Sequence, residues 1–197
     1  MNTISFMTAN YVARQVGYQM TGGWSQGDTA SQAYFKPVKK FADRFESYLK
    51  DIVAMGFDSF DMWTGILHPD WASDDHVDIA NDLINEYDLT VVSLAGGFGN
   101  NDEEFESACQ LAGEIGAEIL GGNTPMLTKD RAFMVDTLHK YGLKFGLENH
   151  PEKTPEELLA KLGKGNEDVL GVAVDTGWFG TQGYDAAQAL DILGGRL

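Results

Sequence analysis

The chain has 197 residues, of which 43% are hydrophobic, and it carries a formal net charge of −16 at pH 7. Its length allows one sizeable domain, and no apolar run approaches the roughly 18 residues that span a membrane. Because nucleic-acid binding needs a basic surface, the acidic balance argues against DNA or RNA as a partner. With a lone cysteine and no basic leader before an apolar segment, we expect a cytoplasmic protein without disulfide bonds.

Strand and helix patterns alternate through the first half of the chain. Strands are predicted over residues 4–9, 57–62 and 90–94. Helices are predicted over residues 41–55, 73–87 and 101–116, the second of them capped by Ser73. Residues 15–37 are predicted to form a long irregular first βα loop, and its aromatic residues, Trp24 among them, indicate that it folds over a site. His76 and His139 lie in helical patterns and are expected to be solvated.

The same alternation continues through the second half. Strands are predicted over residues 117–120, 143–147 and 169–174. Helices are predicted over residues 128–141 and 154–163 and from residue 185 onward. Thr128 and Thr154 are the expected N-caps of the helices at 128–141 and 154–163. Pro155 takes the first position of the second of these helices, where a backbone N–H would have no partner within the helix. Cys109 lies in the preceding helical pattern and is expected to be a buried packing thiol.

Six strand–helix repeats without an intervening hairpin signal predict a parallel sheet. Polar residues at the ends of the predicted strands favour a barrel over an open doubly wound sheet, because barrel active sites gather at strand C-termini. These residues are Asn10, Asp61, Asn123, Glu148 and Asp175. The expected fold is therefore α/β, an incomplete TIM (β/α)₈-type barrel of about six βα units with a long first βα loop. It is expected as a single domain over residues 1–197 that lacks its last two units.

Two of the strand ends carry carboxylates in related surroundings. Glu148 ends an apolar strand and is followed by Asn149, His150 and Pro151, while Asp175 ends the next predicted strand. Neighbouring parallel strands end at the same edge of a sheet, so the two carboxylates are expected to meet. The alternative is that they only cap helices or pair with nearby lysines, Lys144 and Lys153.

The segments Leu147–Glu157 and Val172–Gly177 resemble the sugar phosphate isomerase/epimerase family, and the likeness follows the whole chain in order. That family has the xylose-isomerase-like TIM-barrel fold and holds a divalent metal. The resemblance implies that Glu148 and Asp175 are metal ligands, whereas the family's later His and second Glu have no counterpart here. Mn²⁺ is the expected metal, with Mg²⁺, Co²⁺ or Zn²⁺ as alternatives. Two carboxylates alone are expected to bind it weakly.

The resemblance further implies an isomerase or epimerase that acts on a sugar or sugar derivative by enediolate proton transfer, with Glu148 as the catalytic acid–base. Many relatives have a His three residues after the metal-binding Asp, where this chain has Trp178, so a more apolar or stacked ligand is expected. The substrate-binding positions are expected to be His150, Trp178, His68, Asn123, Trp63 and Trp24.

Other functions remain open from the sequence. A lyase of the same fold is one, either a C-glycoside-cleaving enzyme that works with a small partner subunit or a ring dehydratase. A non-catalytic binding module with an incomplete metal site is another. An endonuclease-IV-like DNA repair enzyme shares the fold, but the acidity and the few histidines argue against it. An incomplete barrel exposes the edges of its first and sixth strands, so an oligomer or a partner chain that completes the barrel is expected.

Overall fold

The computed structural model describes residues 3–197, and its strands form a parallel sheet in the order β1-β2-β3-β4-β5-β6. Helices alternate with the strands, and the described strands do not close into a ring, which confirms the expected incomplete α/β barrel. The internal contacts divide the chain into two compact units, residues up to 96 with 110–117, and residues 97–109 with 118–197. The single domain stays a prediction. None of the described helices is long and apolar enough to cross a membrane.

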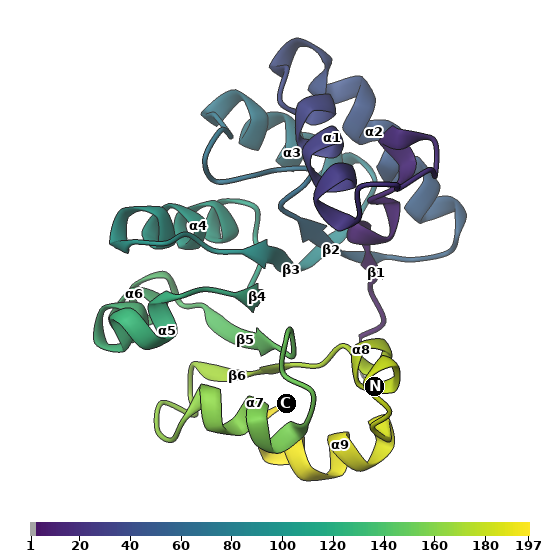
Figure 1. Cartoon of the computed structure of the whole chain (residues 1–197). Helices are drawn as coiled ribbons and strands as arrows, with labels where there is room; N and C mark the ends of the chain where they lie inside the picture. The colour runs from purple at the N-terminus through teal and green to yellow at the C-terminus, as the bar shows by residue number, and fades with distance from the viewer. Residues whose placement is uncertain (1–2) are drawn as a thin grey trace. The chain divides into compact units, whose positions relative to one another are not determined.

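The first unit contains three parallel strands and the helices between them (Figure 1). Its elements are β1 (Phe6–Met7), η1 (Thr8–Tyr11), η2 (Arg14–Val16), α1 (Trp24–Phe35), α2 (Val38–Ala54), β2 (Ser59–Trp63), α3 (Asp74–Glu86) and β3 (Thr90–Gly97). The amphipathic helix α2 confirms the predicted apolar spacing, since its buried residues recur at intervals of three and four. They are Phe41, Phe45, Tyr48, Leu49 and Ile52.

Helix α1 corrects the prediction of an irregular first βα loop over residues 15–37. Its buried residues are Gly27, Ser31 and Phe35, so only one large apolar side chain marks the inward face. A Cβ added at Gly27 would lie 2.3 Å from the Val12 carbonyl oxygen, which explains the need for glycine there. A face built from small residues gives almost no hydrophobic periodicity, and the helix was therefore missed.

His76 also differs from its prediction, because it is 4% exposed rather than solvated. Its Nδ1 accepts a hydrogen bond from the Ser73 backbone N–H at 3.2 Å, and its Nε2 lies 3.0 Å from the Lys36 carbonyl oxygen. The imidazole thus occupies the position of the acidic residue in a capping box at the start of α3. Ser73 is the N-cap, as predicted.

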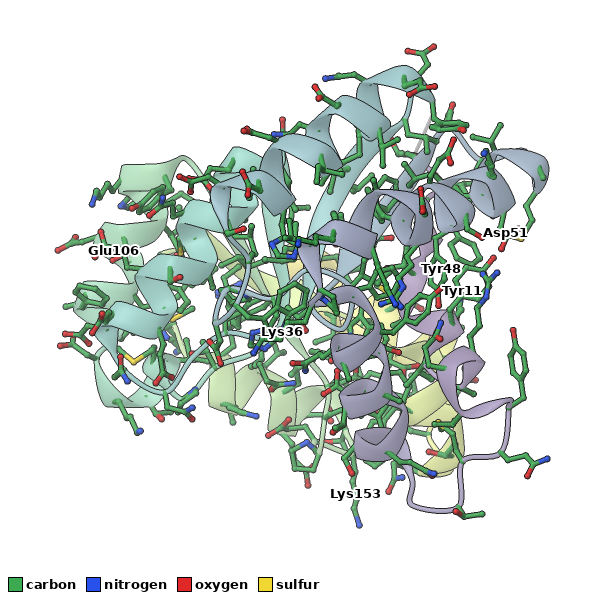
Figure 2. The ribbon with its side chains drawn as sticks, turned by 90° about the horizontal axis from the view of Figure 1, so that it is seen from above. Tyr11, Lys36, Tyr48, Asp51, Glu106 and Lys153 are labelled. Atoms are coloured by element: carbon green, nitrogen blue, oxygen red, sulfur yellow. The ribbon has the colours of Figure 1, made fainter. Side chains whose placement is uncertain are left out.

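The Arg14 side chain connects the segment after β1 to helix α2. Its guanidinium forms an ion pair with Asp51 at 2.6 Å and lies 5.1 Å and 4.5 Å from the ring centroids of Tyr11 and Tyr48. Figure 2 labels Tyr11, Tyr48 and Asp51, which lie together on the first unit. The ion pair and the cation–π contact with Tyr48 connect η2 to α2, and the contact with Tyr11 connects η2 to η1.

The second unit contains the remaining strands and most of the chain's short helices. Its elements are β4 (Ile119–Asn123), α5 (Met126–Lys129), α6 (Arg131–Tyr141), β5 (Lys144–Glu148), α7 (Pro155–Leu162), β6 (Leu170–Ala173), α8 (Thr176–Thr181), α9 (Ala186–Leu193) and η3 (Gly194–Arg196). Helix α4 (Asp102–Glu114) is shared between the units. Figure 1 shows α7 and α9 beside each other, in contact, with β6 next to α7.

The helix starts of the second unit match the predictions in one case and not in another. Thr154 caps α7, its hydroxyl oxygen accepting from the Glu157 N–H at 3.3 Å. Thr128, by contrast, lies inside the short helix α5, and Asp130 caps α6 by accepting from Phe133 N at 3.0 Å. Aspartate is a better N-cap than threonine, so residue type already favoured Asp130 over Thr128.

Part of the outer edge of β6 is covered. The Arg196 guanidinium donates to the Leu170 carbonyl oxygen at 3.0 Å and forms an ion pair with Glu167 at 3.2 Å. Successive carbonyls of a strand point to opposite sides, and Val169 O accepts from Phe145 N on β5, so Leu170 O points away from β5. The predicted oligomer or partner chain stays a prediction.

Candidate metal centre

Strands β5 and β6 bring their C-terminal ends together. They pair in parallel register, Phe145 with Leu170 and Glu148 with Ala173, so Glu148 is the last paired residue of β5. Phe145 and Leu147 are 1% and 0% exposed, and burial of each such side chain contributes about 1.5–3 kcal/mol. A strand anchored in this way holds the Glu148 carboxylate at the edge of the core, with the side chain 39% exposed.

Asp175 lies two residues beyond β6 and begins a new helix. It is the N-cap of α8, and its Oδ1 accepts from the Trp178 backbone N–H at 2.9 Å. The capping interpretation of this carboxylate is therefore correct for one of its oxygens. The second oxygen, Oδ2, is not used by that cap and faces His150.

The His150 imidazole lies between the two carboxylates. Its Nδ1 is 3.2 Å from Glu148 Oε1, and its Nε2 is 3.5 Å from Asp175 Oδ2. Ligand atoms of these three residues all lie within 4.8 Å of one another. The two carboxylates thus pair with His150, within the second unit, rather than with Lys144 or Lys153. The side chains of both lysines are exposed, and Figure 2 shows Lys153 extending outward.

Trp178 lies against this cluster. Its ring centroid is 4.7 Å from that of His150 in an edge-to-face arrangement, and its Nε1 donates to the Glu152 carbonyl oxygen at 2.8 Å. The indole therefore connects the start of α8 to the loop after β5. The structure brings Glu148, His150, Asp175 and Trp178 together, while their roles toward a metal or substrate stay predictions.

The other predicted substrate-binding residues take part in other contacts. Asn123 ends β4 in the second unit, and its backbone oxygen accepts from Phe98 N at 3.0 Å. His68, Trp63 and Trp24 belong to the first unit. There the rings of Trp24 and Trp63 are 5.9 Å apart, Trp63 is 5% exposed, and His68 Nδ1 accepts from the Asp70 N–H at 3.1 Å. Their contact with a substrate stays a prediction.

Two residues make more contacts within the site than the sequence analysis predicted. His150 was expected to contact substrate, and it now offers a third donor atom beside the two carboxylates. The spacing Glu-x-His at a strand end was the available signal. No particular role was predicted for Asn149. In the structure its side chain is 0% exposed, and its amide forms hydrogen bonds with the backbone N–H and the carbonyl oxygen of Asp175. A buried amide among strand-end residues has no distinctive sequence pattern.

The donor set suits a divalent cation. Two carboxylate oxygens and an imidazole nitrogen form a mixed O/N set, which accepts Mn²⁺, Co²⁺ or Zn²⁺ more readily than Mg²⁺. The side chains are 35% to 41% exposed, so a cation and its remaining ligands can reach them from solvent. The net charge of −16 also favours the approach of cations over anions.

No family model matches the chain, and no curated protein matches it. Solved structures do resemble it. One is a D-tagatose 3-epimerase-like protein, with a TM-score of 0.54 and 20% sequence identity over 73% of this chain. Another is a xylose isomerase domain protein from Planctomyces limnophilus, with a TM-score of 0.57 and 12% identity over 76% of this chain. A third is the probable 3-DHS dehydratase AsbF of Bacillus anthracis, with a TM-score of 0.56 and 13% identity over 100% of this chain.

The chain spans 65%, 64% and 71% of the length of these three proteins, respectively. At such low identities the likeness concerns the fold, and it agrees with the parallel six-stranded sheet with alternating helices. The fold that the sequence resemblance implied is thereby confirmed. The described part of the chain has the fold of an incomplete, xylose-isomerase-like α/β barrel.

Proposed function

We propose that Glu148, His150 and Asp175 hold a divalent cation, with Mn²⁺ as the expected metal, in an isomerase or epimerase that acts on a sugar or sugar derivative. The observation that carries this proposal is the meeting of three ligand atoms within 4.8 Å at the ends of two adjacent strands. Barrel enzymes gather their reacting groups at this end of the strands. The epimerase-like and isomerase-domain proteins with the same fold support the choice of reaction.

A bound cation would supply electrostatic stabilisation for the negative charge that develops on the substrate when a C–H beside its carbonyl loses a proton. In the proposal, Glu148 takes that proton and returns it to the neighbouring carbon of the enediolate, which gives the isomerase reaction. The epimerase reaction needs a second acid that delivers a proton to the opposite face of the same carbon. His150 Nδ1, at 3.2 Å, restrains the Glu148 carboxylate, and the edge-to-face contact with Trp178 restrains the imidazole in turn. Trp178 then forms an apolar wall on one side of the substrate.

Metal binding is tested first, by titrating the purified chain with Mn²⁺ and following the free ion by electron paramagnetic resonance. Glu148→Gln is expected to weaken binding at least tenfold because it removes one charged ligand. Glu156→Gln changes the net charge by the same amount at an exposed position of α7 and serves as the control. Equal Mn²⁺ affinity of Glu148→Gln and wild type would refute the proposed centre.

Proton transfer is tested separately. Ketoses are incubated with the Mn²⁺-loaded protein in heavy water, and deuterium at the carbon beside the carbonyl is followed by NMR. Incorporation that is lost in Glu148→Gln supports the isomerase or epimerase reaction. Metal binding without exchange or elimination for any ketose tested would instead support a binding module.

A dehydratase-type lyase is the second candidate, favoured by the likeness to AsbF over the whole of this chain. Proton abstraction next to a carbonyl is common to both reactions, and the lyase then expels a hydroxyl group from the neighbouring carbon. Mass spectrometry of the products separates the two, because a dehydratase releases water and an epimerase leaves the mass unchanged.

A further inference from the structure

Asn149 joins the two strand ends of the candidate metal centre. Its side chain is fully buried, its Oδ1 accepts from the Asp175 N–H at 2.6 Å, and its Nδ2 donates to the Asp175 carbonyl oxygen at 2.9 Å. One planar amide thus satisfies both backbone polar groups of a single residue. The Asp175 N–H would otherwise need another partner, because unpaired backbone groups in a protein interior are costly. The Asp175 carbonyl oxygen also accepts from the Phe179 N–H, at 3.4 Å, so the Asn149 amide is the nearer of its two partners.

The two hydrogen bonds of the Asn149 side chain lie beyond the end of the backbone pairing between β5 and β6. The last paired residues of β5 and β6 are Glu148 and Ala173, and Asp175 lies two residues further along its strand. From there the chain turns into α8, so no β5 backbone group is in register with Asp175. The Asn149 amide takes the place of a peptide group and extends the connection between the two strands to Asp175.

The consequence for the site follows from the order of residues. Glu148 directly precedes Asn149 in the sequence, so the segment that carries one carboxylate also fixes the backbone that carries the other. The Trp178 N–H then fixes the rotation of the Asp175 carboxylate through Oδ1, which leaves Oδ2 facing His150. The position of Oδ2 thus depends on Asn149 for the main chain and on Trp178 for the side chain.

We propose that Asn149 is a positioning residue that sets the spacing of the Glu148 and Asp175 carboxylates; its effect on a metal rests on the function proposed above. Asparagine suits the position because it presents a donor and an acceptor at a fixed separation. Leucine has a similar size and neither group, and aspartate lacks the donor. Glutamine adds a methylene group where the side chain is 0% exposed.

The first test needs no metal. Crystal structures of wild type and Asn149→Leu are compared, and amide hydrogen exchange of Asp175 is measured by NMR. The variant is expected to show faster exchange at Asp175 and a Glu148–Asp175 carboxylate spacing larger than in wild type. An unchanged cluster with an exposed Asp175 amide would overturn the proposal. Asn149→Ala, which also removes both bonds, takes the place of the leucine variant if that one fails to fold.

The second test measures the Mn²⁺ dissociation constant. Loss of a residue that orients a metal ligand raises it by about 10–100-fold, and we expect this range for Asn149→Leu. Asn149→Asp is avoided, because an added negative charge would strengthen cation binding for another reason. The control is Thr124→Val, which removes a buried hydroxyl that donates to Phe98 O at 3.0 Å in the same unit. It is expected to lower the melting temperature without changing the Mn²⁺ affinity.

The two tests separate the two proposals. If wild type binds no Mn²⁺ through Glu148, the proposed function fails, while the spacing in the Asn149→Leu crystal structure still decides the role of Asn149. If wild type binds Mn²⁺ and Asn149→Leu binds it equally well when folded, Asn149 only stabilises the fold and the inference is overturned.

Discussion

Two substitutions at Asp175 separate its capping role from its proposed metal-binding role. Asp175→Asn keeps an oxygen that can accept from the Trp178 N–H, since asparagine caps helices about as well as aspartate. Asp175→Ala removes the cap. Both variants remove the same negative charge from the neighbourhood of Glu148 and His150, so that contribution cancels when the two are compared with each other.

The difference between the variants is therefore expected to equal the value of the cap. Loss of an N-cap costs about 1 kcal/mol, within a range of about 0.5–2. For a chain of this size that corresponds to a melting temperature about 2–4 °C lower for Asp175→Ala than for Asp175→Asn. The charge removed in both variants has an effect below about 1 kcal/mol, because the Asp175 and His150 side chains are 41% and 35% exposed.

Urea unfolding measures the stabilities, and Mn²⁺ titration measures the ligand role. Asp175→Asn and Asp175→Ala are both expected to weaken Mn²⁺ binding at least tenfold, although only the alanine variant loses the cap. If Asp175→Asn bound Mn²⁺ as tightly as wild type, Asp175 would be a helix cap alone. Equal unfolding free energies of the two variants would show that the bond to Trp178 contributes nothing.

Two further predictions concern groups outside the site. Burial raises the pKa of the Cys109 thiol to about 12. At pH 8, iodoacetamide should therefore alkylate the native protein roughly a thousandfold more slowly than the urea-unfolded chain. Similar alkylation rates would contradict the burial of this thiol. The hydrogen bond and the charge of Lys140 hold the pKa of Glu106 below its ordinary value, and Lys140→Gln should raise that pKa in a carbon-13 NMR titration. Because the folded pKa is lowered, the stabilisation from this pair is present above pH 4.5 and is lost as the pH falls through the lowered pKa, so wild type and Lys140→Gln should converge in acid.

The parts of the fold that were predictable depend on local signals. Helix α7 begins where Thr154, Pro155 and an acidic first turn place it, and the buried face of α2 follows its apolar spacing. The strands β5 and β6 were recognisable as short apolar runs between helices. Since parallel strands connected by helices end at one edge, the meeting of Glu148 and Asp175 followed from this order.

The features that were missed depend on contacts between distant segments. The inward face of α1 is defined by the close approach of Gly27 to Val12, which no spacing of apolar residues reveals. His76 is buried because its Nε2 meets the Lys36 carbonyl oxygen, forty positions earlier in the chain. His150 offers a third donor atom because its ring lies between the two carboxylates, one of them 25 positions later in the chain, and residue order alone does not show this contact.

Asp175 shows why capping and metal binding are not competing interpretations of a strand-end carboxylate. An N-cap needs one acceptor oxygen in a defined orientation, and a carboxylate has two. The bond from Trp178 N–H to Oδ1 fixes the plane of the group, and this leaves Oδ2 in one place, 3.5 Å from His150 Nε2. A free carboxylate would lose side-chain entropy on binding a cation, whereas the capped one has already lost most of it on folding. In the proposed centre, the short helix α8 would therefore orient Asp175 as a ligand, and a helix cap at this position is compatible with metal binding by the same carboxylate.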